Sequence, residues 1–150
     1  YLNNEEGALK EGEMPHVVQM WNSMKKVLDE RVDNIVMQEC PLYSDELMLA
    51  GRVDLIAEFD GKLSIIDFKT SSRHKSADEI TGYFLQECGY AVMFEERTGI
   101  KIDQIVTIMV VEGTEDSKVF IEPRDKWVEE LKRRRDEYFD YLNRKIKSSE

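Results

Sequence analysis

Two residues, Asp60 and Gly61, separate two runs rich in branched apolar side chains, residues 47–59 and residues 62–70. An Asp-Gly pair between two such runs predicts a β-hairpin with a two-residue turn. A turn of that length fixes the pairing of the strands, since the residues on either side of it must face each other. The hairpin is therefore the feature that most constrains the fold, and it decides which side chains can meet.

This register predicts that Asp54 lies directly opposite Asp67 and that Arg52 lies opposite Lys69. Side chains alternate between the two faces of a strand, so these four residues share one face of the hairpin. The other face is apolar and can pack on a helix. Its side chains are Val53, Leu55, Ala57, Ile66 and Phe68.

The carboxylates of Asp54 and Asp67 repel each other if they face one another across a strand pair. Burying them without a positive partner is costly. A divalent cation with oxygen ligands is one candidate partner, and Lys69 is another. Ordinary cross-strand ion pairs on a solvated face are the alternative. Ile56 and Ile65 lie on the same face, however, and a face that mixes apolar and clustered charged groups favours a cleft.

The rest of the chain predicts three helices and three further strands around the hairpin. Apolar spacing indicates helices over residues 16–32, 78–98 and 124–147, the second ending at Gly99. Residues 34–44, 103–113 and 117–123 are typical of strands: the first contains Pro41 and suits a sheet edge, while the second suits a buried centre. The order α-β-β-β-α-β-β-α predicts an α/β (α+β) fold, with one mixed sheet flanked by helices.

Composition fits one domain of 150 residues, because 41% apolar residues can build a core. No apolar run approaches the roughly 18 to 20 residues of a membrane helix, and no signal-peptide pattern opens the chain. The two cysteines, Cys40 and Cys88, lack metal-site spacing and predict reduced thiols in an intracellular protein. The net charge of −10 argues against a nucleic-acid partner unless basic residues gather in one groove.

Four features follow one another along the chain: Gly51-x-x-Asp54, the hairpin, Asp67-x-Lys69 and Gln86-x-x-x-Tyr90. In this order and spacing they resemble the PD-(D/E)XK nuclease superfamily, and the last motif resembles its RecB-type branch. Within that branch, "GRVDLIAEFDGKLSIIDFKTSSR" is similar to the mitochondrial genome-maintenance exonuclease and its bacterial and phage relatives. The resemblance implies a restriction-endonuclease-like core and one nuclease domain over residues 1–150.

The resemblance also implies a metal-dependent active site. Asp54 and Asp67 would hold one or two Mg²⁺ or Mn²⁺ ions, with the backbone carbonyl of Phe68 as a further ligand. Lys69 would orient the attacking water or neutralise the developing charge. Glu39 takes the place where the family often carries a glutamate that helps at the metal site, although a solvated strand residue is the alternative.

Gln86 and Tyr90 are four residues apart, so they share a helix face with Tyr83. In the family this face borders the active site and the nucleic acid, while core or edge packing is the alternative for the two tyrosines. Among the basic residues, those at 73–75 could meet phosphate, whereas those at 132–135 suit a solvated helix face.

In RecB-type relatives a helix ahead of the core carries a metal-binding histidine. His16 and His74 do not match its context. We expect that helix to precede Tyr1 or to be absent, which would leave the apolar residues Leu2, Ala8 and Leu9 with little to pack on.

The resemblance therefore implies a Mg²⁺-dependent exonuclease that hydrolyses single-stranded or frayed DNA in repair or recombination. It implies the cytoplasm of a bacterium or of a phage-infected cell, or the mitochondrion of a eukaryote, and no membrane. The first alternative is a nuclease module of a larger helicase–nuclease. The second is a non-catalytic nucleic-acid-binding module that kept the fold.

Overall fold

The computed structural model describes residues 15–44, 49–114 and 116–148, so the expectations for Leu2, Ala8 and Leu9 lie outside it. The elements are α1 (Pro15–Arg31), β1 (Val32–Ser44), β2 (Leu49–Phe59), β3 (Lys62–Ser71), the short 3₁₀ helix η1 (Ala77–Ile80), α2 (Thr81–Thr98), β4 (Gln104–Val111), β5 (Lys118–Pro123) and α3 (Asp125–Ser148). The predicted order α-β-β-β-α-β-β-α is confirmed. No helix in the described parts of the chain is long and apolar enough to cross a membrane.

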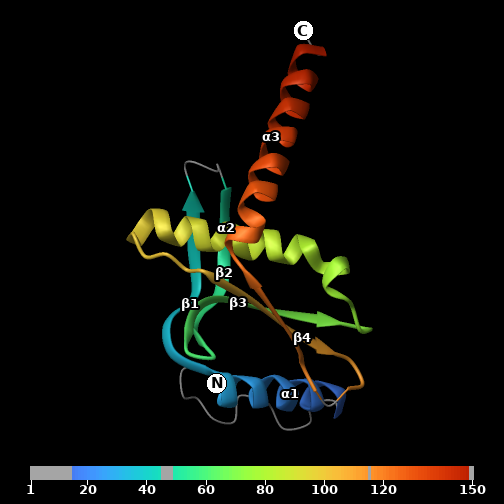
Figure 1. Ribbon diagram of the computed structural model, residues 1–150. Coiled ribbons are helices and arrows are strands. Elements are labelled where there is room, and N and C mark those ends of the chain that lie inside the picture. The colour runs from blue at the N-terminus through green and yellow to red at the C-terminus, as the bar shows by residue number, and fades with distance from the viewer. Residues whose placement is uncertain (1–14, 45–48, 115, 149–150) are drawn as a thin grey trace.

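The five strands form one mixed sheet in the order β1-β2-β3-β4-β5. Only β3 and β4 run parallel; the other neighbours are antiparallel. The crossover between the parallel strands is α2, which lies across one face of the sheet, while α1 lies against the other (Figure 1). The fold is thus the mixed sheet flanked by helices that the sequence predicts, and it is consistent with the restriction-endonuclease-like core that the resemblance implies.

The hairpin turn has the predicted geometry. Asp60 and Gly61 have positive φ angles of 52° and 81°, which a tight two-residue turn requires. The pairs from Leu55–Ile66 to Phe59–Lys62 follow the register that this turn sets. The turn also docks on the end of α1, because the Arg31 guanidinium pairs with the Asp60 carboxylate and Arg31 O accepts the Asp60 N–H.

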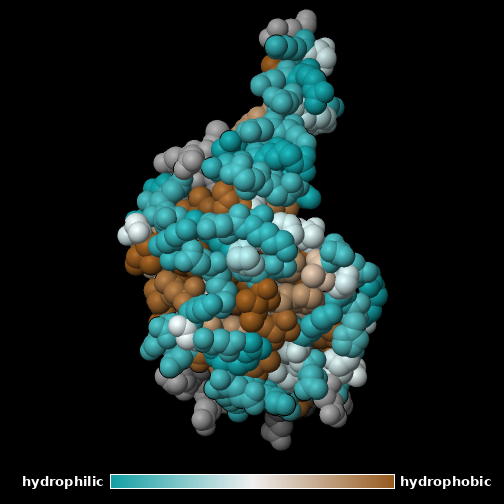
Figure 2. All heavy atoms as spheres, viewed as in Figure 1, coloured by the Kyte–Doolittle hydropathy of each residue, from teal (hydrophilic) through white to brown (hydrophobic). Residues whose placement is uncertain are grey.

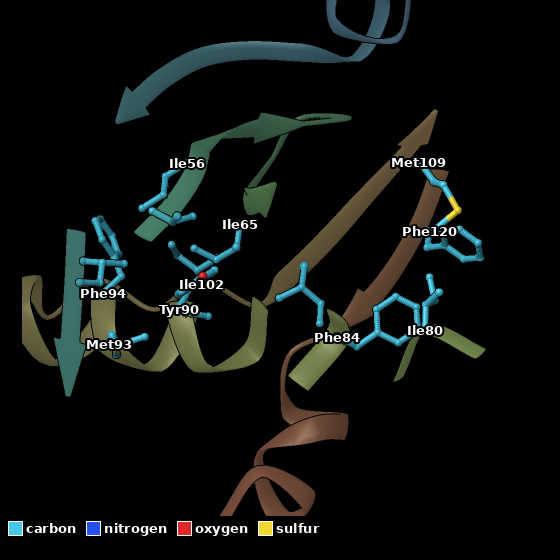
Figure 3. Close-up of a cluster of buried hydrophobic side chains, with 14 of the residues drawn as sticks. Ile56, Ile65, Ile80, Phe84, Tyr90, Met93, Phe94, Ile102, Met109 and Phe120 are labelled. Carbon is cyan, nitrogen blue, oxygen red and sulfur yellow. The ribbon is translucent and has the colours of Figure 1, made fainter. Parts of the chain in front are cut away.

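Two apolar clusters hold the helices on the sheet. Neighbouring residues Ile65 and Ile66 belong to different clusters, because successive side chains of a strand point to opposite faces. On one face, Ile65 and Ile56 belong to the same cluster as Phe84 and Phe94 of α2 (Figure 3). On the other, the side chains that pack with Leu28 of α1 are Leu55, Ala57, Phe59, Ile66, Val106 and Ile108.

One part of the predicted hairpin face is wrong. Val53 packs in the α2 cluster, whereas Leu55, two residues later, packs in the α1 cluster. Strict alternation would place both on one face, so β2 changes face at Asp54. Opposite this point, Glu39 of β1 has a left-handed backbone with φ 47°, which is uncommon for a residue other than glycine. The two-residue period of the sequence could not reveal this irregularity.

The edge strand β1 carries the predicted Pro41, which pairs with Arg52. Its register shift lies between Asp33 and Met37 rather than at the proline. At the other end of the chain, α3 extends away from the sheet and is mostly hydrophilic (Figures 1 and 2). None of its described side chains is buried. Arg133 and Arg134 pair with Glu130 on the same helix, as expected of a solvated face.

Candidate active site

The candidate site lies where β2 separates from β3. Their ladder ends at the pair Leu55–Ile66, one residue before Asp54 and Asp67 would face each other. The Asp54 side chain enters this gap, and its Oδ2 accepts the Phe68 N–H at 3.0 Å. The Asp54 carboxylate therefore accepts a backbone hydrogen bond from β3 at the point where the ladder with β2 ends.

Asp67 is 3% exposed and lies on the α2 face of β3, two residues after Ile65. Burial raises the pKa of Asp67 to about 7; the hydrogen-bonding contact with Asp54 raises it too, and Lys69 lowers it. Asp67 Oδ2 is buried and 3.0 Å from Lys69 Nζ, an ion pair without the angles of a hydrogen bond, so this oxygen has no donor in the described structure. The two carboxylates thus meet as predicted, although not as a regular cross-strand pair.

Lys69 reaches from β3 towards α2. Besides Asp67, its Nζ lies 3.3 Å from Gln86 Oε1 and 4.8 Å from the centre of the Tyr83 ring. Burial lowers the pKa of Lys69, but its ion pair with Asp67, with smaller contributions from the charges of Asp54 and Glu87, leaves this pKa above its usual value. The ammonium group is therefore charged and held between the Asp67 carboxylate on β3 and side chains of α2.

Tyr90 connects the helix to β2. It is 5% exposed, and a Cβ added at Gly51 would lie 2.6 Å from Tyr90 Cε1. Only glycine lets the ring approach β2 so closely. Burial raises the pKa of Tyr90, while a hydrogen bond to the Arg52 backbone lowers it. The ring packs in the buried core, whereas Gln86 on the same helix is exposed and contacts Lys69.

The structure places Glu39 and Arg52 away from this cluster. Arg52 pairs with Pro41 in the sheet rather than opposite Lys69, and its Nε donates to the Glu39 carbonyl at 3.1 Å. The two side chains are 3.9 Å apart and largely exposed. The predicted pairing of Arg52 with Lys69 is therefore wrong, because the ladder between β2 and β3 ends before it reaches them.

The site suits a small divalent cation held by few protein ligands. Within the described residues, no three His, Cys, Asp or Glu side chains gather closely enough to hold a metal ion. Asp54 and Asp67 nevertheless bring two carboxyl groups into contact, and Asp67 Oδ2 is a buried oxygen without a donor. Mg²⁺ commonly binds to one or two carboxylates and keeps several waters. The donor set therefore fits Mg²⁺ or Mn²⁺ better than a closed zinc site.

Sequence reasoning missed one buried acid beside the site, Glu87. It is 0% exposed, and Thr107 Oγ1 of β4 donates to its Oε1 at 2.5 Å. Burial raises the pKa of Glu87 well above its usual value, although the Thr107 hydrogen bond opposes the rise. A signal was present: residue 87 falls at helical spacing between buried Phe84 and Ala91, on the face that packs on the sheet.

Fold and site together define a restriction-endonuclease-like core with two acids and a lysine at the hairpin. The sequence model of the PD-(D/E)XK nuclease superfamily matches residues 8–149, and the chain belongs to this superfamily. Nucleases of this superfamily generally use divalent metals such as Mg²⁺ or Mn²⁺.

Among solved structures, the fold is similar to a protein from Eubacterium rectale named "Putative exonuclease". The TM-score is 0.60 at 12% sequence identity, and the match covers 85% of this chain and 52% of that one. This chain thus spans about half the length of that relative. No functionally curated protein matches the chain.

Proposed function

We propose that the protein is a Mg²⁺- or Mn²⁺-dependent deoxyribonuclease that degrades single-stranded or frayed DNA from its ends, as RecB-type nucleases do. The observation that carries this proposal is the meeting of Asp54, Asp67 and Lys69 at the end of the hairpin ladder, with Gln86 reaching them from α2. The name of the Eubacterium rectale relative supports the preference for ends.

Three groups would hold the cation: the carboxylates of Asp54 and Asp67, and the carbonyl of Phe68. The N–H and C=O of one strand residue point to the same edge of the strand. Because the Phe68 N–H points to Asp54, its carbonyl is expected at the same edge. When bound, the cation supplies positive charge to the scissile phosphate and acidifies a water molecule. Glu39 would join only if its exposed side chain turned from Arg52.

Lys69 would act on the phosphate rather than hold the cation. Its ammonium is a compact point charge with three donors, and it lies beside the Asp67 carboxylate. It would orient the attacking water or neutralise charge that develops on the phosphate. Gln86 fixes the ammonium by accepting one of its hydrogens. Tyr90 fixes β2 through its contact with Gly51 and so keeps Asp54 in place.

Cleavage assays with end-labelled DNA test the proposal. We expect linear single strands to be degraded with Mg²⁺ or Mn²⁺, and circular single strands and reactions with EDTA to stay intact. Asp67→Asn should abolish cleavage, and Lys69→Met should keep metal binding but lower the single-turnover rate by about 10²-fold. Asp103→Asn removes an exposed carboxylate that pairs with Lys101 and serves as the matched control. Cleavage that persists in Asp67→Asn would contradict the proposed site.

A second candidate function is a nucleic-acid-binding module without catalysis. It is favoured by one observation: only two carboxylates meet at the hairpin, and no third acidic or histidine side chain in the described residues completes a metal-binding group. The wild-type protein would then bind labelled DNA and leave every substrate intact with either metal. A nuclease module of a larger helicase–nuclease would instead cleave as described above.

A further inference from the structure

Glu87 is a buried carboxyl group to which the proposed reaction gives no role. Its Oε1 accepts the Thr107 hydroxyl hydrogen, and its Oε2 has no hydrogen-bond partner in the described structure. Burying an acid with an unpaired oxygen destabilises a fold, whereas an apolar pair of the same shape can be neutral or stabilising. Fold stability therefore does not explain why an acid stands at this position.

Thr107 is the in-register neighbour of Asp67. The parallel strands β3 and β4 pair Asp67 with Thr107, and adjacent strands lie about 4.8 Å apart. Both side chains lie on the α2 face: Ile65 and Ile105, two residues before each, pack in the α2 cluster. The Thr107 hydroxyl therefore stands next to the carboxylate proposed to hold the cation.

A threonine hydroxyl has one hydrogen to donate. In this structure it goes to Glu87, on the helix above the sheet, at an oxygen–oxygen distance of 2.5 Å. Asp67 Oδ2, although buried, has no hydrogen-bond partner in the described structure, and Lys69 Nζ lies 3.0 Å from it. Glu87 thus accepts the hydroxyl hydrogen of Thr107, and Asp67 does not.

We propose that Glu87 is a positioning residue of the metal site: it engages the single hydroxyl hydrogen of Thr107 and so keeps that donor away from Asp67. The Asp67 carboxylate then stays free to bind a divalent cation. Without Glu87, the hydroxyl rotates towards Asp67 and competes with the cation for its oxygen. The inference rests on the proposed function only in taking a divalent cation as the ligand of Asp67.

Calorimetric titration with Mn²⁺ tests this on four proteins: the wild type, Glu87→Met, Thr107→Val and the double variant. Glu87→Met should weaken Mn²⁺ binding about tenfold, since a hydrogen bond to a charged group must be broken. Thr107→Val removes the competing donor and should bind as the wild type does. The double variant should recover wild-type affinity within about twofold. A merely structural role predicts no such recovery, because a second core change normally adds damage.

Two controls separate the hydrogen bond from packing. Glu87→Gln keeps an acceptor for Thr107 and should retain wild-type affinity. Cys88→Val changes the next buried residue of α2, whose thiol faces the Arg124 carbonyl instead, and should alter stability without altering Mn²⁺ affinity. If Glu87→Met does not fold, Glu87→Leu takes its place. Unchanged affinity in the folded variant, or a double variant as weak as Glu87→Met, overturns the inference.

A crystal structure of Glu87→Met gives a readout that needs no metal. We expect Thr107 Oγ1 within hydrogen-bond distance of Asp67, and a hydroxyl that points elsewhere overturns the inference. If the wild type binds no Mn²⁺ at all, the proposed metal site fails, and this structure alone still decides the role of Glu87.

Discussion

At the scale of single residues, the position of Lys69 depends on groups from two elements. Its ammonium contacts the carboxylate of Asp67 on β3, the amide oxygen of Gln86 and the ring of Tyr83 on α2. The ring face carries partial negative charge and attracts the cation. Tyr83 thus contacts the lysine, and it also packs against the α2 cluster, the alternative that its sequence position allowed.

Tyr83→Leu should lower the single-turnover cleavage rate about two- to fivefold, because a cation–π contact of this kind contributes roughly 0.5–1 kcal/mol at an accessible site. Tyr83→Phe keeps the ring and should cleave as the wild type does. NMR provides the second measurement: the ring should shift the Lys69 ε-CH₂ protons upfield, and Tyr83→Leu should remove this shift. Tyr138→Leu, on the exposed part of α3, is the control. Equal rates for Tyr83→Leu and Tyr83→Phe would leave the ring without a role.

The raised pKa of Asp67 predicts how the stability of the metal-free protein depends on pH. The pKa is about 7 in the folded protein, against a usual value of 3.8. Between these values the folded state holds a proton that the unfolded state has lost, so the free energy of unfolding falls as pH rises from about 4 to about 7. Glu87, whose pKa is also raised, acts in the same direction.

Thermal unfolding in EDTA across this pH range measures the effect. Asp67→Asn should flatten the dependence, and Asp67→Asn with Glu87→Gln should flatten it further. Saturating Mg²⁺ should also flatten it for the wild type, because the bound cation keeps Asp67 ionised. If the free energy of unfolding in EDTA rises with pH over this range, the pKa of Asp67 is not raised in the folded protein.

At the scale of elements, the contact between Gly51 and Tyr90 explains two motifs at once. Gly51 belongs to the first motif and Tyr90 to the last, and the ring occupies the space where any other residue would place its Cβ. The sequence shows both residues but not this contact, because nothing in a linear pattern measures the distance between β2 and α2. The same limit applies to the change of face at Asp54, which occurs just beyond the part of β2, Leu55 to Phe59, that follows the predicted register.

Gly51→Ala should push Tyr90 away from β2 and reduce stability by about 1–3 kcal/mol, the usual cost of overpacking. The cleavage rate should fall as well, since Asp54 lies three residues along the same strand. The matched control is Gly82→Ala on α2, where an added Cβ meets no atom within 4 Å and alanine favours the helix. Circular dichroism melting and single-turnover cleavage measure both variants. An unchanged melting temperature for Gly51→Ala would contradict the close packing.

At the scale of the whole molecule, the sequence predicted the element order and the central strand, because periodicity and turn residues report on burial. The sequence also indicated that Asp54, Asp67, Lys69 and Gln86 lie close together. The hairpin turn places the first three on paired strands, and the helix that follows β3 carries Gln86. The predicted pairing of Arg52 with Lys69 was wrong, and the exposed side chains of Arg52 and Glu39 lie next to each other. Their positions depend on where β2 leaves β3, which is set by packing against α2 rather than by local sequence.

Charge is the property of the whole molecule that bears on a DNA substrate. The chain carries a net charge of −10, and several of its basic side chains are neutralised within the fold. Arg73 pairs with Glu79, and Arg133 and Arg134 pair with Glu130. The phosphate backbone normally binds to free cationic groups, so DNA should bind weakly to the metal-free protein. Its affinity should then depend on the divalent cation at Asp54 and Asp67.

This dependence predicts that the wild type and a variant without the two carboxylates change order in DNA affinity when a divalent cation is added. In EDTA at about pH 8, above the pKa of about 7 of Asp67, the variant with both Asp54→Asn and Asp67→Asn should bind a labelled single strand about fivefold more tightly than the wild type, because two negative charges no longer repel the phosphates. With Ca²⁺ or Mg²⁺ the wild type should bind more tightly, since only its carboxylates can hold the cation. Both differences should shrink as salt is raised. Asp103→Asn, at an exposed acid that pairs with Lys101, should follow the wild type in both conditions. Fluorescence anisotropy measures all three proteins, and an order that does not change with the cation would show that DNA is held elsewhere on the molecule.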